Sequence, residues 1–355
     1  MLTLHYTLHF ATPAFLGNAE QSGQWRTPPI KALLRQWWRV AYAADQIGAV
    51  NVSAMREAEG RLFGTASDNG GGSSKSLVRI RLSQWGLGKL TDWPRTAGQG
   101  VKHDEVTMLV DPQLYLGYGP LSFDRLTKQT ALKTKTNAAL QANLEKASLQ
   151  LAFPGGKDAD RLLHALWLMQ QYGTLGGRSR NGWGSLVLTP ADTTTPAFDA
   201  LLNSRACMPW RVALGADWPR AIGTDEQGPL VWQTAPMADW PAVMRRLAEI
   251  KIGLRTQFKF PQERPPHVQP LDRHWLSYPI TNHATSAWGR ESRLPNSLRF
   301  KVRETSAGQL RGVIVHLPCL PPPAFKPDRL AVESVWLRVH QYLDGQAPAL
   351  QRTPA

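Results

Sequence analysis

The chain has 355 residues, with 41 Lys and Arg against 27 Asp and Glu, so its formal net charge is +14. Hydrophobic residues make up 42 % of it and charged residues 19 %, which excludes a disordered basic tail and predicts a folded protein with its cations on the surface. The length suits two domains rather than one.

The two cysteines give no sign of a metal or redox centre. Cys207 and Cys319 lie far apart in sequence and near no cluster of Cys and His, so we expect no disulfide framework, no zinc site, no other cofactor and a reducing cytoplasm. The first ten residues lack a basic start and a continuous apolar run, and no stretch approaches the roughly 18 apolar residues of a membrane span. The cations occur mainly in predicted strands, one helix and a Gly-rich loop, which favours nucleic acid over a membrane surface as partner.

The first half of the chain predicts the order strand, helix, strand, strand, helix, strand, with insertions that include a short extra helix. Alternating apolar residues indicate strands, and apolar residues at helical spacing indicate helices, the first with Thr27 as N-cap and Pro28 and Pro29 in its first turn. The predicted elements are a strand over 1–10, a helix over 27–44, a short helix over 53–63, a strand over 77–82, strand-like pieces near 105–110 and 114–118, a strand over 149–153, a helix over 158–172 and a strand over 185–188. Residues 66–75 form a flexible insertion and residues 127–146 a projecting loop or hairpin.

The polar run 190–196 is the best domain boundary, and a similar pattern follows it. The second half predicts a strand over 210–214, a helix over 241–254, a hairpin of 298–303 with 310–317 and a helix over 328–343. We therefore expect an α+β protein with two ferredoxin-like (RRM-like, βαββαβ) domains with insertions. They would occupy residues 1–190, including a Gly-rich loop at 173–184, and 197–345, followed by a tail at 346–355.

Basic residues recur at regular spacing in two elements. Lys31, Arg35 and Arg39 form a stripe on the helix over 27–44, which contains no acid to pair with them. The stretch 245–303 holds twelve basic and four acidic residues, and its strand places Arg299, Lys301 and Arg303 on one face. A solvated sheet face is the alternative, but the same pattern at Arg79 and Arg81 favours contacts with nucleic-acid phosphates.

The Gly-rich loop surrounds Arg178, Ser179, Arg180 and Asn181 with five glycines, at 173, 176, 177, 182 and 184. It follows a helix and precedes a strand, the reverse of the order in dinucleotide and P-loop motifs, which argues against a nucleotide-binding enzyme. Glycines let a backbone approach a phosphodiester closely, arginines offer forked donors, and Trp183 offers a ring for stacking. In the alternative interpretation the glycines only allow a tight crossing within the fold. Trp37 and Trp38 are expected in the core.

Four segments resemble the RAMP superfamily of CRISPR proteins, and most closely the first subunit of the Cmr (type III-B) effector complexes. They are FLGNAE (15–20), WRTPPIKALLRQWWR (25–39), GRLFGT (60–65) and LGGRSRNGWGSL (175–186), and RLPNSLRFKV (293–302) is similar to a late family strand. The resemblance implies a cytoplasmic, non-catalytic RNA-binding subunit near the guide 3′ end. Its partners would be CRISPR RNA, complementary target RNA and other RAMP subunits, with no membrane and no small-molecule substrate. The residues it assigns to RNA binding are Arg26, Lys31, Arg35, Arg39, Arg178, Ser179, Arg180, Asn181 and Trp183.

Two other functions remain open from the residues. A metal-independent RAMP endoribonuclease that processes CRISPR transcripts would need general acid and base groups, for which His267, His274 and His283 with Tyr278 are candidates. His5 and His9 share the polar face of the first strand, as a catalytic pair or as ordinary sheet residues. No acids stand in a metal-binding motif, and no Ser-His-Asp order is evident. The third possibility is a scaffold that contacts only proteins.

Overall fold

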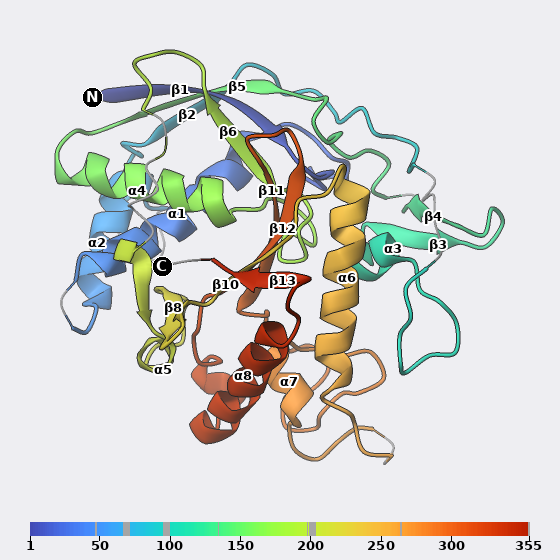
Figure 1. The fold of residues 1–355 in the computed structure, drawn as a ribbon. Coiled ribbons are helices and arrows are strands. Elements are labelled where there is room, and N and C mark those ends of the chain that lie inside the picture. Colours follow the sequence, from blue (N-terminus) through green and yellow to red (C-terminus); the bar gives the residue numbers. More distant parts are fainter. Residues whose placement is uncertain are drawn as a thin grey trace. The chain divides into compact units, whose positions relative to one another are not determined.

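The computed structural model describes residues 1–46, 48–66, 72–94, 100–133, 135–196, 198, 204–262 and 265–353. The chain divides into two compact units that interleave in sequence. The first unit comprises Met1–Arg95, Gly117–Ala206 and Lys301–Leu310, and the second comprises Thr96–Leu116, Cys207–Phe300 and Arg311–Ala355. The fold is mixed α and β, as predicted (Figure 1).

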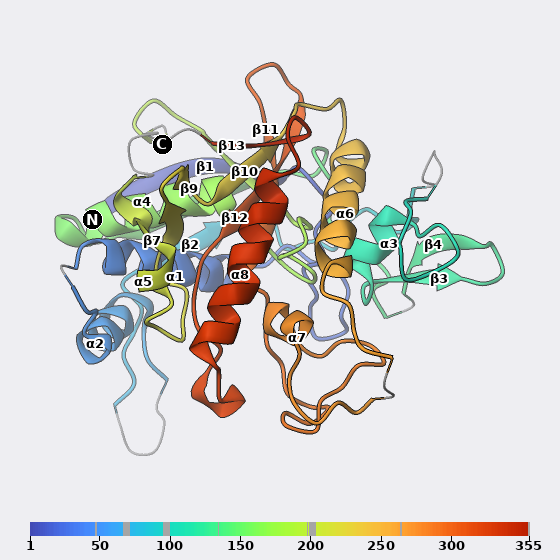
Figure 2. The same ribbon diagram turned by 60° about the horizontal axis from the view of Figure 1, so that its bottom comes forward.

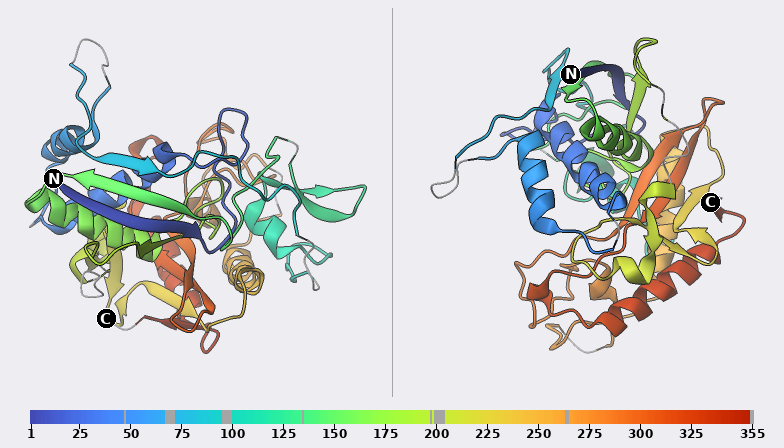
Figure 3. Two further views of the ribbon diagram at one scale, coloured as in Figure 1. Left: turned by 90° about the horizontal axis from the view of Figure 1, so that it is seen from above. Right: turned by 90° about the vertical axis from the view of Figure 1, so that its left-hand side faces the viewer.

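The first unit is built on a four-stranded antiparallel sheet with the order β2-β5-β1-β6. Its strands are β1 (Leu2–Phe10), β2 (Arg79–Leu82), β5 (Ala147–Phe153) and β6 (Leu186–Pro190). Every second residue of β1 from Leu4 to Phe10 is fully buried. Figure 3 shows α1 (Thr27–Ala44) and α4 (Lys157–Tyr172) together on one side of this sheet.

Helix α1 buries the residues that its periodicity predicts. Its apolar side includes Leu34, Trp37 and Trp38, each completely buried, which confirms the two tryptophans as core residues. The N-cap is Arg26 rather than Thr27, and no side chain caps the helix, so Pro28 and Pro29 lie in a first turn that begins at Thr27. Helix α2 (Val52–Phe63) follows, with the Asn51 side chain accepting a hydrogen bond from the Ala54 amide.

The region between β2 and β5 differs from the predicted strand-like pieces. Residues 105–110 form no strand, and α3 (Pro112–Gly117) replaces the second piece because the Asp111 carboxylate accepts hydrogen bonds from the amides of Gln113 (2.7 Å) and Leu114 (3.2 Å). Within the projecting segment predicted over 127–146 lies β4 (Gln129–Leu132), which forms a hairpin with β3 (Leu121–Asp124), just before that segment. Of the predicted insertion at 66–75, residues 67–71 lie outside the described residues.

The second unit contains most of a four-stranded sheet with the order β11-β12-β10-β13. The strands are β10 (Val231–Thr234), β11 (Leu298–Glu304), β12 (Leu310–His316) and β13 (Leu350–Arg352), with α6 (Trp240–Thr256) after β10 and α8 (Arg329–Asp344) after β12. The remaining elements are the small sheet of β7 (Cys207–Pro209), β8 (Ile222–Asp225) and β9 (Gly228–Pro229), with α5 (Trp210–Ala213), α7 (Asp272–Leu276) and two 3-10 turns, Ser204–Ala206 and Pro323–Phe325.

Two predictions for the second half are wrong. Residues 210–214 were expected as a strand, but they form α5, which buries Trp210 and Ala213 at a spacing of three. Residues 346–355 were expected as a tail, but 350–352 form β13, which pairs with β10. The predicted helix over 241–254, the hairpin and the last helix are confirmed by α6, β11 with β12, and α8. Of the helices in the described ranges, none is both long and apolar enough to span a bilayer.

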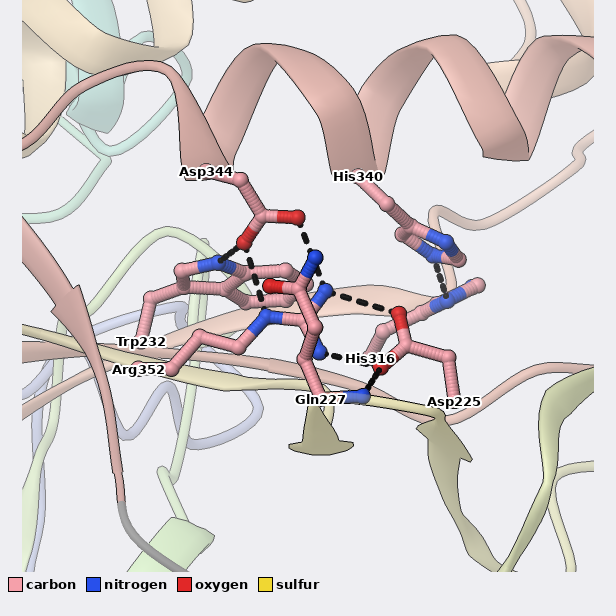
Figure 4. A network of polar contacts seen from close by, with 7 residues as sticks. All are labelled: Asp225, Gln227, Trp232, His316, His340, Asp344 and Arg352. Carbon is pink, nitrogen blue, oxygen red and sulfur yellow. Dashed lines mark hydrogen bonds and ion pairs between the residues drawn. The ribbon is translucent and has the colours of Figure 1, made fainter.

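A buried ionic network holds β13 within the second unit (Figure 4). The Arg352 guanidinium donates to both oxygens of Asp344 and both oxygens of Asp225, over 2.5 to 2.8 Å. The Trp232 indole N–H donates to Asp344 (2.8 Å), and behind this cluster the rings of His316 and His340 lie 2.9 Å apart, Nδ1 to Nε2. Arginine paired with two carboxylates in a part-buried site satisfies most of its donors, so β13 is anchored despite its three residues.

Candidate nucleic-acid interface

The Gly-rich loop is folded against the chain's own backbone. The Gly177 amide donates to Phe15 O and the Gly184 amide to Pro13 O, each over 2.9 Å. Gly176 and Gly184 have positive φ. A Cβ on Gly176 would lie 2.5 Å from Phe15 O, and one on Gly184 would lie 1.9 Å from Leu175 O. These two glycines are therefore required by close crossings within the fold, as the alternative interpretation expected.

Arg178 stands at the outer end of this loop. It has a φ of 54° and an exposed side chain, and its Nη2 atom lies 3.3 Å from the point where a Cβ on Gly119 would stand. The Asn181 amide donates to Arg178 O (2.9 Å), which closes the turn that carries Ser179 and Arg180. Ser179, Arg180 and Asn181 are half-exposed. Among the described residues no carboxylate forms an ion pair with Arg178, so its charge is available to a ligand.

Arg26 is held close to the loop by the segment Phe15–Gly17. The Arg26 guanidinium donates to Gly17 O (2.8 Å), two residues from the carbonyl that receives the Gly177 amide. The structure thus brings together Arg26, at the start of α1, and the loop that follows α4. These residues are about 150 positions apart in the chain, and both sides were assigned to RNA by the resemblance.

The stripe on α1 has an acidic partner that the helix itself lacks. The buried Glu59 carboxylate on α2 accepts hydrogen bonds from Arg35 and from Arg39, the latter over 2.5 and 2.8 Å. Burial by itself would raise the pKa of Glu59, but the two arginines outweigh it and lower that pKa. For Lys31, burial and then the charge of Arg35 lower the pKa. Arg35 and Arg39 remain partly exposed, with 44 % of each side chain accessible.

Two predictions about RNA contacts are wrong. One is base stacking by Trp183, and the other is an exposed row of cations on β11. Trp183 is completely buried, with its ring centroid 5.3 Å from that of Phe15 and 5.5 Å from that of Trp93, so it has no open face for a base. Lys301 and Arg299 are also buried. The expected exposed row of Arg299, Lys301 and Arg303 does not exist, because both faces of β11 are covered up to Val302.

Lys301 has a structural role instead. Its ammonium donates to Gln170 O (2.5 Å), Leu186 O (2.8 Å) and Met169 O (3.4 Å). Gln170 and Met169 belong to the last turn of α4, whose carbonyls carry the negative end of the helix dipole, and Met169 O also accepts from the Gly173 amide that caps the helix. Arg303 donates to the Gln171 side chain in the same turn. Two cations of β11 therefore stabilise the C-terminal end of a helix.

A family model, the RAMP superfamily, matches residues 7–187. The matched range contains β2, β5, α1, α4, the Gly-rich loop and parts of β1 and β6. The chain belongs to the RAMP superfamily.

The comparison with solved structures gave matches at low sequence identity. Cmr1 from Pyrococcus furiosus in its apo form has 16 % identity and a TM-score of 0.47 over 99 % of this chain and 98 % of that one. A chain of a type III-B Cmr-β complex bound to cognate target RNA has 11 % identity and a TM-score of 0.47 over 95 % and 99 %. A chain of a type IV-B CRISPR complex has 12 % identity and a TM-score of 0.31 over 56 % and 94 %. No curated protein matches the sequence.

Exposed aromatic residues of this RAMP chain lie elsewhere than predicted. Tyr118 is 61 % exposed beside Gly119, with Lys133 Nζ 5.7 Å from its ring centroid. Trp85 is 54 % exposed, and its carbonyl accepts from Gln24 (2.9 Å), next to the segment that leads into α1. The sequence around each ring could have indicated that it is exposed. Tyr118 stands in a GYGP turn, and Trp85 follows the strand of Arg79 and Arg81, which are exposed as predicted.

The histidines proposed for catalysis in the RAMP chain do gather, in the second unit. His267 Nε2 lies 3.2 Å from His283 Nδ1, and their rings are parallel. His274 is completely buried, and its Nδ1 accepts from the Leu271 amide (2.9 Å) while its Nε2 donates to His283 O (2.7 Å). Burial lowers the pKa of both His274 and His283.

Of the four catalytic candidates, the three histidines and Tyr278, two use their polar atoms for hydrogen bonds within the fold. Both ring nitrogens of His274 are occupied, and the Tyr278 hydroxyl donates to Gly289 O (2.7 Å) while accepting from the Thr285 amide (3.2 Å). In the first unit, His9 lies 2.8 Å from Glu304, and His5 lies 3.8 Å from Asp192. His5 and His9 therefore take separate acids. Within the described part of the chain, no three His, Cys, Asp or Glu side chains form a group that could hold a metal.

Proposed function

We propose that the chain is a cytoplasmic, non-catalytic RNA-binding subunit of a type III-B (Cmr) CRISPR effector complex. It contacts guide RNA, target RNA or both near the 3′ end of the guide and assembles with other RAMP subunits. The observation that carries the proposal is membership of the RAMP superfamily over the range that contains Arg26, the α1 stripe and the Gly-rich loop.

The sheet orders support two ferredoxin-like domains in this subunit. In chain order, each sheet is formed by a strand, a helix, two strands, a helix and a strand, with further elements inserted. The four strands lie in the order β2-β5-β1-β6 in one sheet and β11-β12-β10-β13 in the other. In both, the third strand of the motif pairs with the first and the fourth lies on the other side of the first, as in a split β-α-β unit. The limits of 1–190 for the first domain and the start at 197 for the second remain part of the proposal, and the second domain extends beyond the predicted end at 345 to include β13.

The charges of the first unit suit a single RNA strand. Arg178 has no carboxylate partner in the described chain, Arg26 is bound to Gly17 in the segment that also receives the Gly177 amide, and Tyr118 offers an exposed ring next to Gly119. Guanidinium groups bind phosphates, and tyrosine rings stack on bases of any sequence, so the group would bind RNA with little sequence preference. The proposed RNA contacts are Arg26, Lys31, Arg35, Arg39, Arg178, Ser179, Arg180 and Asn181, together with Tyr118.

The test is a double variant, Arg178→Ala with Arg180→Ala. We expect weaker binding of single-stranded RNA of every sequence and a plot of log affinity against log salt that is flatter by about 1.4, since each phosphate contact on a single strand contributes about 0.7. Fluorescence anisotropy at several salt concentrations measures both.

The matched control is Arg329→Ala with Arg338→Ala on α8, which removes the same charge from arginines already paired with Glu333 (2.8 Å) and Asp272 (2.6 Å). We expect this control to bind RNA nearly as well as the wild type. Equal losses in both double variants would show that only net charge matters, and unchanged binding in the loop variant would refute the loop's role.

A metal-independent ribonuclease is the second candidate, favoured by the contact of His267 with His283. Labelled CRISPR repeat RNA incubated with the protein in EDTA decides between the two. Cleavage that disappears in His283→Ala and persists in His5→Ala would establish the enzyme. Intact RNA with the wild-type protein would leave the binding subunit as the function.

A further inference from the structure

Two arginines of the second unit lie together with too few acceptors. Arg255 is in the last turn of α6, and Arg273 is in α7 (Figure 2). The Nε atoms of both are buried, and neither has a hydrogen-bond partner in the described part of the chain. A buried N–H donor without an acceptor is rare in folded proteins and commonly marks a bound water or ion.

Arg273 is already committed on one side. Its Nη1 forms an ion pair with Glu105 (2.5 Å), and its guanidinium lies over the Phe260 ring, 5.3 Å from the centroid. Phe260 in turn stacks on His283, with 3.8 Å between centroids. The carboxylate of Glu105 thus serves one edge of Arg273 and leaves its Nε without an acceptor.

Arg255 has no carboxylate partner among the described residues. Burial is the largest influence on its pKa and lowers it, while Tyr115, Arg273 and Glu105 act on it from close by. The C-terminal end of a helix favours a cation, which explains a charge in the last turn of α6 but supplies no acceptor for the buried Nε. The cluster has two cations against one anion, and an unpaired charge in such a place is costly.

We propose that Arg255 and Arg273, with the hydroxyl of Tyr115, bind a phosphate group. A tetrahedral anion presents several acceptor oxygens to forked guanidinium donors and would supply the missing charge as well as the missing acceptors. Arg255, Tyr115 and Glu105 are partly or well exposed, so the cluster reaches the surface and a ligand can enter. The phosphate is either free or part of an RNA chain, and the site stands independently of the RNA contacts proposed for the first unit.

The test follows thermal unfolding of the full chain in a phosphate-free buffer titrated with inorganic phosphate, with ionic strength held constant by NaCl. A ligand that binds only the folded state raises the melting temperature. We expect such a rise for the wild type and a phosphate affinity at least about tenfold weaker in Arg255→Gln, the loss of one charge-assisted hydrogen bond. Arg246→Gln, the same change on the same helix at an arginine paired with Glu249 (2.9 Å), should behave as the wild type.

A second measurement guards against a misfolded variant. Broadening of the ³¹P resonance of inorganic phosphate should occur with the wild type and with Arg246→Gln and be absent with Arg255→Gln, whose circular dichroism must match the wild type. Competition by single-stranded RNA for the phosphate signal would identify an RNA phosphate as the ligand, and lack of competition a free phosphate. No phosphate response in the wild type, or an equal response in Arg255→Gln, would overturn the proposal.

Discussion

Lys301 illustrates how a single buried cation can be a structural group rather than a ligand-binding one. Its three ammonium donors meet three backbone carbonyls, two of them in the last turn of α4. The Met169 carbonyl also accepts from the Gly173 amide (2.8 Å), so a side chain without donors at this position would remove a partner chiefly from Gln170 O and Leu186 O.

The substitution Lys301→Met keeps the length of the side chain and removes the donors. We expect a loss of about 3 kcal/mol in the free energy of unfolding, because the gain from not burying a charge does not offset the lost hydrogen bonds to Gln170 O and Leu186 O. Urea unfolding measures it. Lys146→Met, at an exposed lysine of the same unit, should change stability by no more than about 0.5 kcal/mol. Equal stability of the two variants would contradict the structural role.

At the scale of elements, Glu59 and RNA phosphates compete for the arginines of the α1 stripe. The carboxylate on α2 holds Arg35 and Arg39 in place and competes with any phosphate for their donors. Its lowered pKa indicates that it is charged at neutral pH, so the stripe presents two arginines partly neutralised by one acid.

We therefore expect Glu59→Gln to bind single-stranded RNA more tightly and with a steeper salt dependence, while the free energy of unfolding falls by about 2 kcal/mol as a buried ion pair is broken. Glu57→Gln removes the same charge from an exposed position of the same helix and serves as the control. Anisotropy titrations and urea unfolding give the two quantities. RNA affinity that rises equally in both variants would mean that the stripe is not a specific contact.

The elements that could be predicted are those long enough to show a period. β1, α1, α4 and α8 repeat their apolar residues over several turns or pleats, whereas β10 and β13 have four and three residues and show no alternation. The apolar residues of 210–214 fit the period of a strand as well as that of a helix. They form a helix, which buries Trp210 and Ala213 on one side.

Much of the candidate site could be predicted for the same reason, and the exceptions have a physical cause. The sequence places cations on β11 at every second position, but it cannot show that the C-terminal carbonyls of α4 lie against that strand. Likewise, the glycines around Trp183 suggest an open loop, whereas their close crossings bury the ring. Interactions between distant segments decide whether a charged or aromatic side chain is exposed.

At the scale of the whole molecule, stability should depend on pH through the second unit. Burial lowers the pKa of His340 to about 4 and that of His316 well below its usual value. Because both pKa values are lower in the folded state than in the unfolded state, the unfolded chain takes up protons first as the pH falls. Stability is therefore fully present above about pH 6.5 and is lost progressively toward pH 4.

For His340 alone, the expected loss is about 2 to 3 kcal/mol by pH 4.5. Unfolding in urea between pH 7.5 and 4.5 measures it. In His340→Gln the fall should be smaller by that amount, and in His5→Gln, at a half-exposed residue, the fall should match the wild type. A stability that stays constant down to pH 4.5 in the wild type would show that the buried pair does not resist protonation.

The position of Lys301 also bears on how the protein is made. The ammonium that completes the end of α4 is encoded 131 residues after Gln170. At about 5 to 20 residues per second, the ribosome adds that stretch in roughly 7 to 26 s. Once β6 has been made, the nascent chain holds the four strands of the first sheet and both of its packed helices, but for the rest of this interval it lacks the ammonium that binds the end of α4. A fragment that stops at residue 206 would stay permanently in that unfinished state.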